Sequence, residues 1–253
     1  MNRKRIGAGI ALAVLLLVGG CVGSAPIAVK PEIASKAKTI GIISVVGDDL
    51  AYRNVPVFRW DQEEHFRNVN AWAMDDHVTA EMAKILQPGR EIIAVDFDRA
   101  AFRVSRDSVF GFMTPNDIAK AMAANVRGSK PDLYLVVLQS RAGFETSGTP
   151  AEGMGVLRRP VLGGDLYYLH AIYSITVVDG PTNKILASAE AVDGSRSPWS
   201  SVLHGAPYDE FEEEHWAVEN EDVNSAQIDW VRDRMKALFA RTLPTTLQRL
   251  KVI

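Results

Sequence analysis

Cysteine is almost missing from this chain, because Cys21 is the only one among 253 residues. A single thiol excludes an intrachain disulfide, so the fold must be stable without covalent cross-links. Zinc ligands are also scarce: there is no HExxH sequence, and no two of the five histidines lie four residues apart. We therefore interpret the histidines as structural or surface residues.

An excess of basic residues is absent as well. The chain has 28 Lys and Arg against 31 Asp and Glu, which gives a net charge of −3. Nucleic-acid binding needs a basic surface that displaces counterions from phosphates, so we predict no nucleic-acid partner. The hydrophobic fraction of 47% and charged fraction of 23% are ordinary for a globular protein. The length suits one domain.

The motifs of common enzyme families are also missing. Ser140 and Ser195 lack the GxSxG sequence that exposes a nucleophile. The glycines of segment 141–165 match neither GxGxxG nor the GK[ST] of a P-loop. The sequence therefore predicts no catalytic residue and no cofactor, and it favours a protein without enzymatic activity.

The amino terminus has the pattern of an export signal. Three basic residues, Arg3, Lys4 and Arg5, precede an apolar run from Ile6 to Val18. This run is shorter than the roughly 20 residues that a membrane-spanning helix needs. The pattern therefore predicts a cleaved signal peptide in place of a permanent transmembrane segment.

The signal ends in VGGC at residues 18–21. This sequence resembles the lipobox of bacterial lipoproteins, in which an aliphatic residue and small residues precede a cysteine. The resemblance implies that residues 1–20 are removed and that Cys21 is acylated, which makes membrane lipid the first predicted partner. Two or more acyl chains would anchor the protein stably, since each buried methylene contributes about 0.8 kcal/mol.

The resemblance also bears on location. In enterobacterial lipoproteins an Asp directly after the cysteine favours retention in the inner membrane, and this chain has Val22 there. The expected location is therefore the cell envelope, facing the periplasm, with the outer membrane favoured over the inner.

The mature chain is predicted to consist of a tether and one domain. Residues 21–38 are mostly small, contain proline and lack a clear pattern, which is typical of a tether. Beyond them, apolar β-branched runs indicate strands, and apolar residues every three to four positions indicate helices. The expected strands are 39–46, 91–96, 133–138, 167–177 and 185–191, and the expected helices are 74–85, 114–127 and 228–244, the last ending near Pro244.

The remaining segments are predicted to be connections. Residues 50–70 are aromatic and charged without a clean period, so we expect an elaborated loop or a short hairpin. Residues 141–165 are rich in glycine and are expected to form a loop.

The predicted order β-α-β-α-β-β-β-α gives an α/β fold over residues 39–253, a mixed sheet with packed helices. This order behind a lipobox is similar to that of periplasmic lipoprotein domains of the curli-secretion type, the penicillin-binding-protein-activator type and the TolB amino-terminal type. The resemblance is one of topology, and it implies a non-catalytic module that contacts other proteins.

Acidic residues follow two of the predicted strands. Asp48 and Asp49 come after the first strand, and Asp96 and Asp98 come at and after the end of the second. Ligands often bind at the carboxyl ends of strands in open α/β sheets, and carboxylates suit Mg²⁺. These four residues could form a metal site, or they could be turn and solvent-facing residues. A metal-assisted envelope hydrolase is therefore an alternative function.

Aromatic residues gather in the inserts between the predicted elements. Protein interfaces are enriched in aromatic residues and arginine. The candidate partner-binding residues are Trp60, Phe66, Phe211 and Trp216. The other interpretation is that these loops pack on one another. The function that the sequence favours is binding or assembly of an envelope protein, which could be a second copy of this chain, so an oligomeric structural component is a further alternative.

Overall fold

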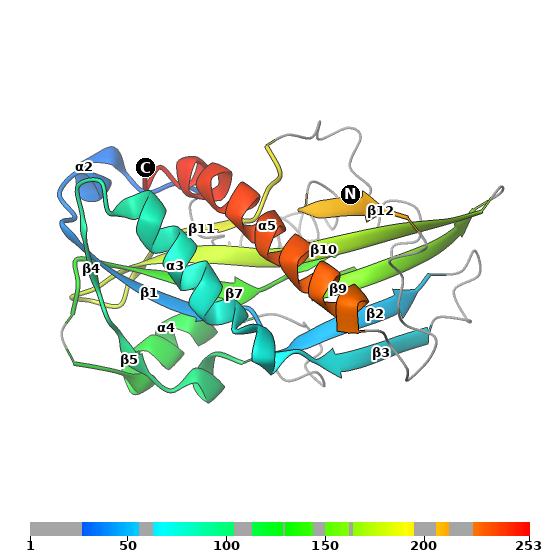
Figure 1. Ribbon diagram of the computed structural model, residues 1–253. Coiled ribbons are helices and arrows are strands. Elements are labelled where there is room, and N and C mark those ends of the chain that lie inside the picture. The colour runs from blue at the N-terminus through cyan, green and yellow to red at the C-terminus, as the bar shows by residue number, and fades with distance from the viewer. Residues whose placement is uncertain are drawn as a thin grey trace, which may run out of the picture.

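The fold is built around one large mixed sheet with helices packed on it (Figure 1). The computed structural model describes residues 27–55, 63–103, 113–128, 130–143, 150–161, 164–194, 206–212 and 225–253. The predicted fold class, an α/β mixed sheet with packed helices, is confirmed. The export signal and Cys21 lie outside the described residues.

The predicted elements occur in the predicted order, with additional ones between them. The strands are β1 (Thr39–Val45), β2 (Asp49–Asn54), β3 (Glu63–Asn68), β4 (Glu91–Ile93), β5 (Asp96–Phe97), β6 (Val126–Arg127), β7 (Leu133–Gln139), β8 (Arg141–Gly143), β9 (Pro150–Val161), β10 (Gly164–Asp179), β11 (Ile185–Glu190) and β12 (Tyr208–Phe211). The α-helices are α2 (Pro31–Ala34), α3 (Met74–Leu86), α4 (Pro115–Asn125) and α5 (Ser225–Arg249), and the short 3₁₀ helices are η2 (Asn70–Trp72) and η3 (Arg99–Phe102).

The long strand β10 divides the sheet into two halves. Its second part pairs with β7 on one side and β11 on the other, and β1 and β4 follow beyond β7 as parallel strands. Its first part pairs with β9 and β12, and β2 and β3 follow beyond β9. We call the part with β7, β1 and β4 the helix-covered half, and the part with β9, β2 and β3 the hairpin half.

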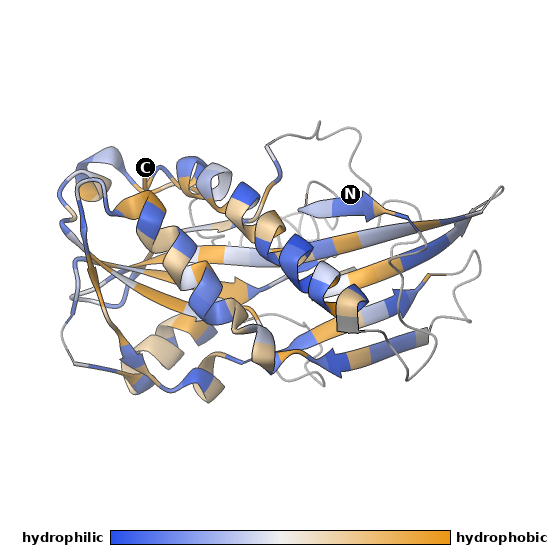
Figure 2. Ribbon diagram, in the orientation of Figure 1, coloured by the Kyte–Doolittle hydropathy of each residue, from blue (hydrophilic) through white to orange (hydrophobic). Residues whose placement is uncertain are grey.

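Helices lie on both faces of the helix-covered half. Helices α3 and α5 pack on one face, and α4 and η3 pack on the other (Figure 1). The amino-terminal part of α5 continues over the hairpin half, where Trp230 lies 5.4 Å from Phe211 of β12, measured between ring centroids. Figure 2 shows the apolar residues of the strands as bands beneath α3 and α5.

Local sequence signals explain the elements that were predicted. Helix α4 begins with a capping box, in which the Thr114 hydroxyl accepts from the Asp117 N–H and the Asp117 carboxylate accepts from the Thr114 N–H. The Thr114 hydroxyl also donates to the Asp117 carboxylate at 2.6 Å. This bond, together with the one from the Thr114 N–H, lowers the pKa of Asp117. Helix α3 buries one apolar stripe, which consists of Met74, Val78, Met82 and Leu86. The predicted helices 74–85 and 114–127 are therefore confirmed as α3 and α4.

Segment 141–165 differs from its prediction as a loop, because it contains β8 and β9. Gly155 in this segment allows β9 and the His170 side chain of β10 to pack closely. A Cβ atom added to Gly155 would lie 2.4 Å from Nε2 of His170 on the neighbouring strand β10. Segment 50–70 holds the short hairpin of β2 and β3, one of the two forms expected for it.

Helix α5 also differs from its prediction, because it continues past Pro244 to Arg249. A proline inside a helix removes one backbone hydrogen bond and costs about 3 kcal/mol. The turns after it are held by burial, since Leu247 and Leu250 are fully enclosed in the core. The predicted strand 91–96 is divided between β4 and β5.

Part of the predicted tether packs against the domain. Val29, Ala34 and Ala37 are buried, and the Val29 N–H donates to the Leu250 carbonyl at 2.9 Å. The packed chain therefore begins before residue 39. Within the described ranges, no helix is both long enough and apolar enough to span a membrane.

Candidate functional site

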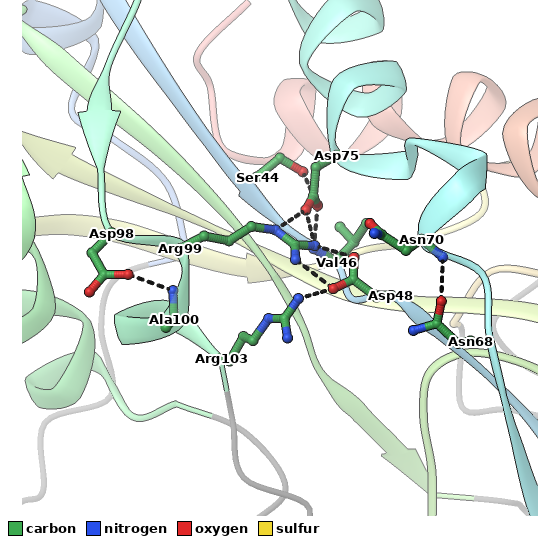
Figure 3. Close-up of polar contacts among 10 residues, drawn as sticks. All are labelled: Ser44, Val46, Asp48, Asn68, Asn70, Asp75, Asp98, Arg99, Ala100 and Arg103. Atoms are coloured by element: carbon green, nitrogen blue, oxygen red, sulfur yellow. Dashed lines mark hydrogen bonds and ion pairs between the residues drawn. The ribbon is translucent and has the colours of Figure 1, made fainter.

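The carboxyl end of β1 holds a cluster of charged side chains (Figure 3). Arg99, the first residue of η3, reaches Asp48, which lies between β1 and β2. Its Nη1 and Nη2 each donate to one carboxylate oxygen of Asp48 at 2.6 Å. Such a two-point contact holds the planar guanidinium in a defined orientation. Arg103 forms a second ion pair with Asp48.

Asp75 is the second acid of this cluster, and it comes from the first turn of α3. One of its oxygens accepts from Nε of Arg99 at 2.7 Å. The other accepts from the Ser44 hydroxyl at 3.1 Å and from the Val46 N–H at 2.8 Å. The carboxylate also lies where it interacts favourably with the helix dipole. Asp75 therefore ties strand β1, helix α3 and helix η3 together.

The cluster is balanced in charge, with the carboxylates of Asp48 and Asp75 facing the guanidinium groups of Arg99 and Arg103. Asp48 and Asp75 are 14% and 17% exposed at their side chains, so the pairs are partly shielded from water. The arginines occupy the Asp48 oxygens that a metal ion would need and would repel a cation. The geometry suits a structural clamp at the end of the sheet.

The other metal candidates belong to β2, β5 and the start of η3. Asp49 is the first residue of β2 and is opposite Asn68 of β3. Asp96 belongs to β5, and the Asp98 carboxylate caps η3 by accepting from the Ala100 N–H at 3.0 Å. In the part of the chain that the structure describes, no three His, Cys, Asp or Glu side chains are grouped so that they could share a metal ion.

His170 is a buried ionisable group inside the hairpin half. Its Nδ1 lies 3.1 Å from the carbonyl oxygen of Gly153, which fits a ring N–H donating to that oxygen. Burial lowers the pKa of His170 to about 3. The Gly153 contact offsets only part of this lowering, and the positive charge of Arg53 lowers the pKa by a smaller amount. The imidazole is therefore neutral at physiological pH, as a packed structural residue would be.

The remaining histidines are not brought together with His170. Nε2 of His77 lies 3.1 Å from the Lys236 carbonyl oxygen, which links α3 to α5, and His65 is exposed on β3. His204 and His215 lie outside the described residues.

Two of the four aromatic candidates fall within the described residues, and they differ. Phe66 is 46% exposed on β3, the last strand of the hairpin half. Phe211 instead packs between Tyr167 and Trp230, with ring centroids 5.7 and 5.4 Å away. Phe211 therefore contributes to the packing of β12 and α5, as in the alternative interpretation. Trp60 and Trp216 lie outside the described residues.

A second charged contact was not anticipated from the sequence. Arg241 of α5 donates to Asp193 at 2.9 Å and to Asp209 of β12 at 2.8 Å. The Asp193 side chain is 2% exposed, so this contact holds α5 against the segment after β11. Neither this bridge nor the Arg99 cluster has a local signal, because each joins residues at least 24 positions apart.

Comparison with known proteins gives little similarity. No family model matches the chain, and no curated protein matches it. One solved structure that resembles it is the lipoprotein GNA1162 from Neisseria meningitidis, with 11% identity, a TM-score of 0.26, and coverage of 81% of this chain and 99% of that one. Function is therefore inferred from the residues of this chain alone.

Proposed function

We propose that this chain is a lipid-anchored lipoprotein of the bacterial cell envelope, whose domain binds another envelope protein and carries out no catalysis. The sequence VGGC at residues 18–21, behind a charged and then apolar segment, carries the proposal. Acylation at Cys21 would hold the domain at the membrane surface. The outer membrane is favoured, because Val22 stands where Asp would favour the inner membrane.

Two features of the domain support a role without catalysis. The best-placed acid, Asp48, is engaged by two arginines, and the fully buried histidine is held neutral. Both fit structural roles. Phe66 is the candidate contact for the partner, since it is a large apolar side chain left exposed on β3.

The proposal is tested by comparing the wild-type protein with Cys21→Ala after crosslinking in intact cells. We expect the wild type to have lost residues 1–20, to have acyl mass on Cys21, and to fractionate with the outer membrane. Cys21→Ala should carry no acyl mass. A wild-type protein that is unacylated and soluble would contradict the anchor.

The crosslinked species tests the binding role. A defined envelope protein that is captured by the wild type and lost in Phe66→Ala supports the proposal. Phe211→Ala is not a clean test, because removal of that ring disturbs the packing around Trp230. Capture of a second copy of this chain would identify the oligomeric alternative. Metal-dependent hydrolysis that is abolished by Asp48→Ala would instead establish the enzyme alternative.

A further inference from the structure

One end of the domain collects five segments that are far apart in the sequence. They are residues 27–38, 87–91, 130–132, 179–184 and 250–253, and we call them together the basic end. Hydrogen bonds join them: Val29 N–H to the Leu250 carbonyl, Arg90 to the Ala34 carbonyl, and Lys130 to the Pro181 carbonyl. In Figure 1 this end holds α2 and the carboxyl terminus, at the opposite end of the domain from the start of β10.

The basic end differs in charge from the rest of the chain. It has seven basic side chains against four acidic ones. Beyond it, the chain after the predicted signal has 18 basic and 27 acidic residues, a clear excess of negative charge. The lysines of the basic end are exposed, and they are Lys30, Lys36, Lys38, Lys130, Lys184 and Lys251.

Two of its four acids are engaged by the protein itself. The Asp132 carboxylate accepts from the Lys38 and Thr39 N–H groups at 2.7 and 3.0 Å. Asp179 accepts from the Thr182 N–H at 3.0 Å, within the turn between β10 and β11. Their carboxylates are therefore directed at backbone groups of the domain, whereas the six lysines are exposed residues and one of them, Lys130, also donates to the Pro181 carbonyl.

Exposed apolar side chains accompany the lysines. In the described part of the chain four large hydrophobic residues are exposed, and two of them, Ile27 at 55% and Ile253 at 47%, belong to the basic end. Lysines around exposed apolar side chains are typical of surfaces that lie in the headgroup region of a bilayer.

The position of Cys21 brings this end to the membrane. Val29 is the first buried residue of the described part of the chain, and it lies eight positions after Cys21. A fully extended chain of that length spans at most about 29 Å. With Cys21 acylated, the basic end therefore stays close to the lipid surface in any orientation of the domain.

We infer that the basic end docks on an anionic phospholipid surface, with the lysines at the headgroups and Ile27 and Ile253 inserted among them. The inference rests on the proposed function, because it takes Cys21 to be lipidated. Electrostatic attraction of lysines to acidic lipids is short-ranged and screened by salt. Docking would orient the hairpin half, with Phe66, away from the membrane.

Energy transfer on vesicles tests this orientation. Cys21 is the only native cysteine and its sulfur would be acylated, so one introduced cysteine can be labelled selectively. Ser35→Cys places a donor fluorophore at the basic end. Leu166→Cys places one near the start of β10. At about 3.4 Å per residue, this second site is roughly 45 Å along the strand from Asp179, which belongs to the basic end. Both residues are exposed. The acceptor is attached to lipid headgroups.

The full acylated protein is placed in vesicles of phosphatidylcholine with phosphatidylglycerol, or of phosphatidylcholine alone. With phosphatidylglycerol we expect transfer from Ser35→Cys to exceed that from Leu166→Cys by about threefold or more, given the separation of the two sites. The difference should shrink without phosphatidylglycerol and at high salt.

Matched charge reversals give the control. In Lys30→Glu/Lys36→Glu the docked fraction should fall by about tenfold or more. Lys120→Glu/Lys236→Glu makes the same change in net charge on α4 and α5, outside the basic end, and should leave docking unchanged. Equal effects of the two pairs would overturn the specific role of the basic end.

The outcomes separate the two proposals. Flotation with vesicles and acyl mass on Cys21 report the anchor, whereas the transfer difference reports docking. An anchored protein with equal transfer from both labels would overturn docking and leave the proposed function standing. An unacylated protein that does not float would overturn both.

Discussion

The helix-covered half and the hairpin half of the sheet handle their ionisable groups in different ways. The helix-covered half keeps charged groups in ion pairs at the carboxyl end of β1, where Arg99 joins Asp48 and Asp75. The hairpin half keeps His170 neutral in its interior, where the ring lies against Gly155 of β9. The first arrangement depends on the attraction of opposite charges, whereas the state of His170 depends on burial and close packing. The two halves should therefore respond differently to substitution and to pH.

The largest effect is expected from Gly155→Ala, which breaks the hairpin half. The new Cβ would lie 2.4 Å from Nε2 of His170 and 2.8 Å from the Ala51 carbonyl oxygen. Overpacking of this kind should lower the free energy of unfolding by about 3 kcal/mol or more, as measured by urea denaturation. With His170→Ala already present, the same change should cost at least about 1 kcal/mol less. Additive losses would contradict a direct clash with the imidazole.

A smaller loss is expected from Arg99→Ala, which breaks the clamp of the helix-covered half. It leaves Asp75 and Asp48 without their shared guanidinium, in positions that are partly shielded from water. The free energy of unfolding should fall by about 2 kcal/mol, less than for a fully buried pair because Arg99 is 32% exposed. Arg232→Ala, which removes exposed pairs on α5, is the control and should cause no measurable change. Equal effects at both sites would show that the clamp adds little.

The third prediction concerns pH: His170 should make the stability of the hairpin half depend on pH. Unfolded His170 has a pKa of 6.5, whereas the folded value is about 3, so the unfolded state binds one more proton between these values. Stability should fall as the pH drops below 6.5, by up to about 1.4 kcal/mol per pH unit from this residue. In His170→Gln that part of the slope should disappear. An unchanged slope between pH 6.5 and 4 would mean that His170 is not held neutral.

The helix-covered half was largely predictable from the sequence, because its signals are local. Strand β7 is a continuous apolar run, and α4 begins at a threonine cap followed by proline. The hairpin half was predicted less well. Pro150, Gly153 and Gly155 are typical of a loop. In β9, however, Gly153 and Gly155 contact His170, which is 15 residues or more away along the chain.

Candidate sites were harder to predict than elements. Acids at the end of β1 were expected, and Asp48 does lie in a charged cluster. Its arginine partners, however, are the first residue of η3 and the residue directly after η3, about 50 positions later. No spacing rule connects such positions. The exposure of Phe66 and the packing of Phe211 likewise depend on contacts between distant strands and helices, which residue type alone does not determine.

Strand β10 has a mechanical consequence for the whole domain. Between Leu166 and Asp179 it contains neither glycine nor proline, and it is hydrogen-bonded on both sides over most of its length. It offers no hinge at which the two halves could bend. A force applied at the hairpin half would therefore be transmitted along β10 to the opposite end of the domain, as shear across many hydrogen bonds. We expect the two halves to move as one rigid body and to unfold in a single step.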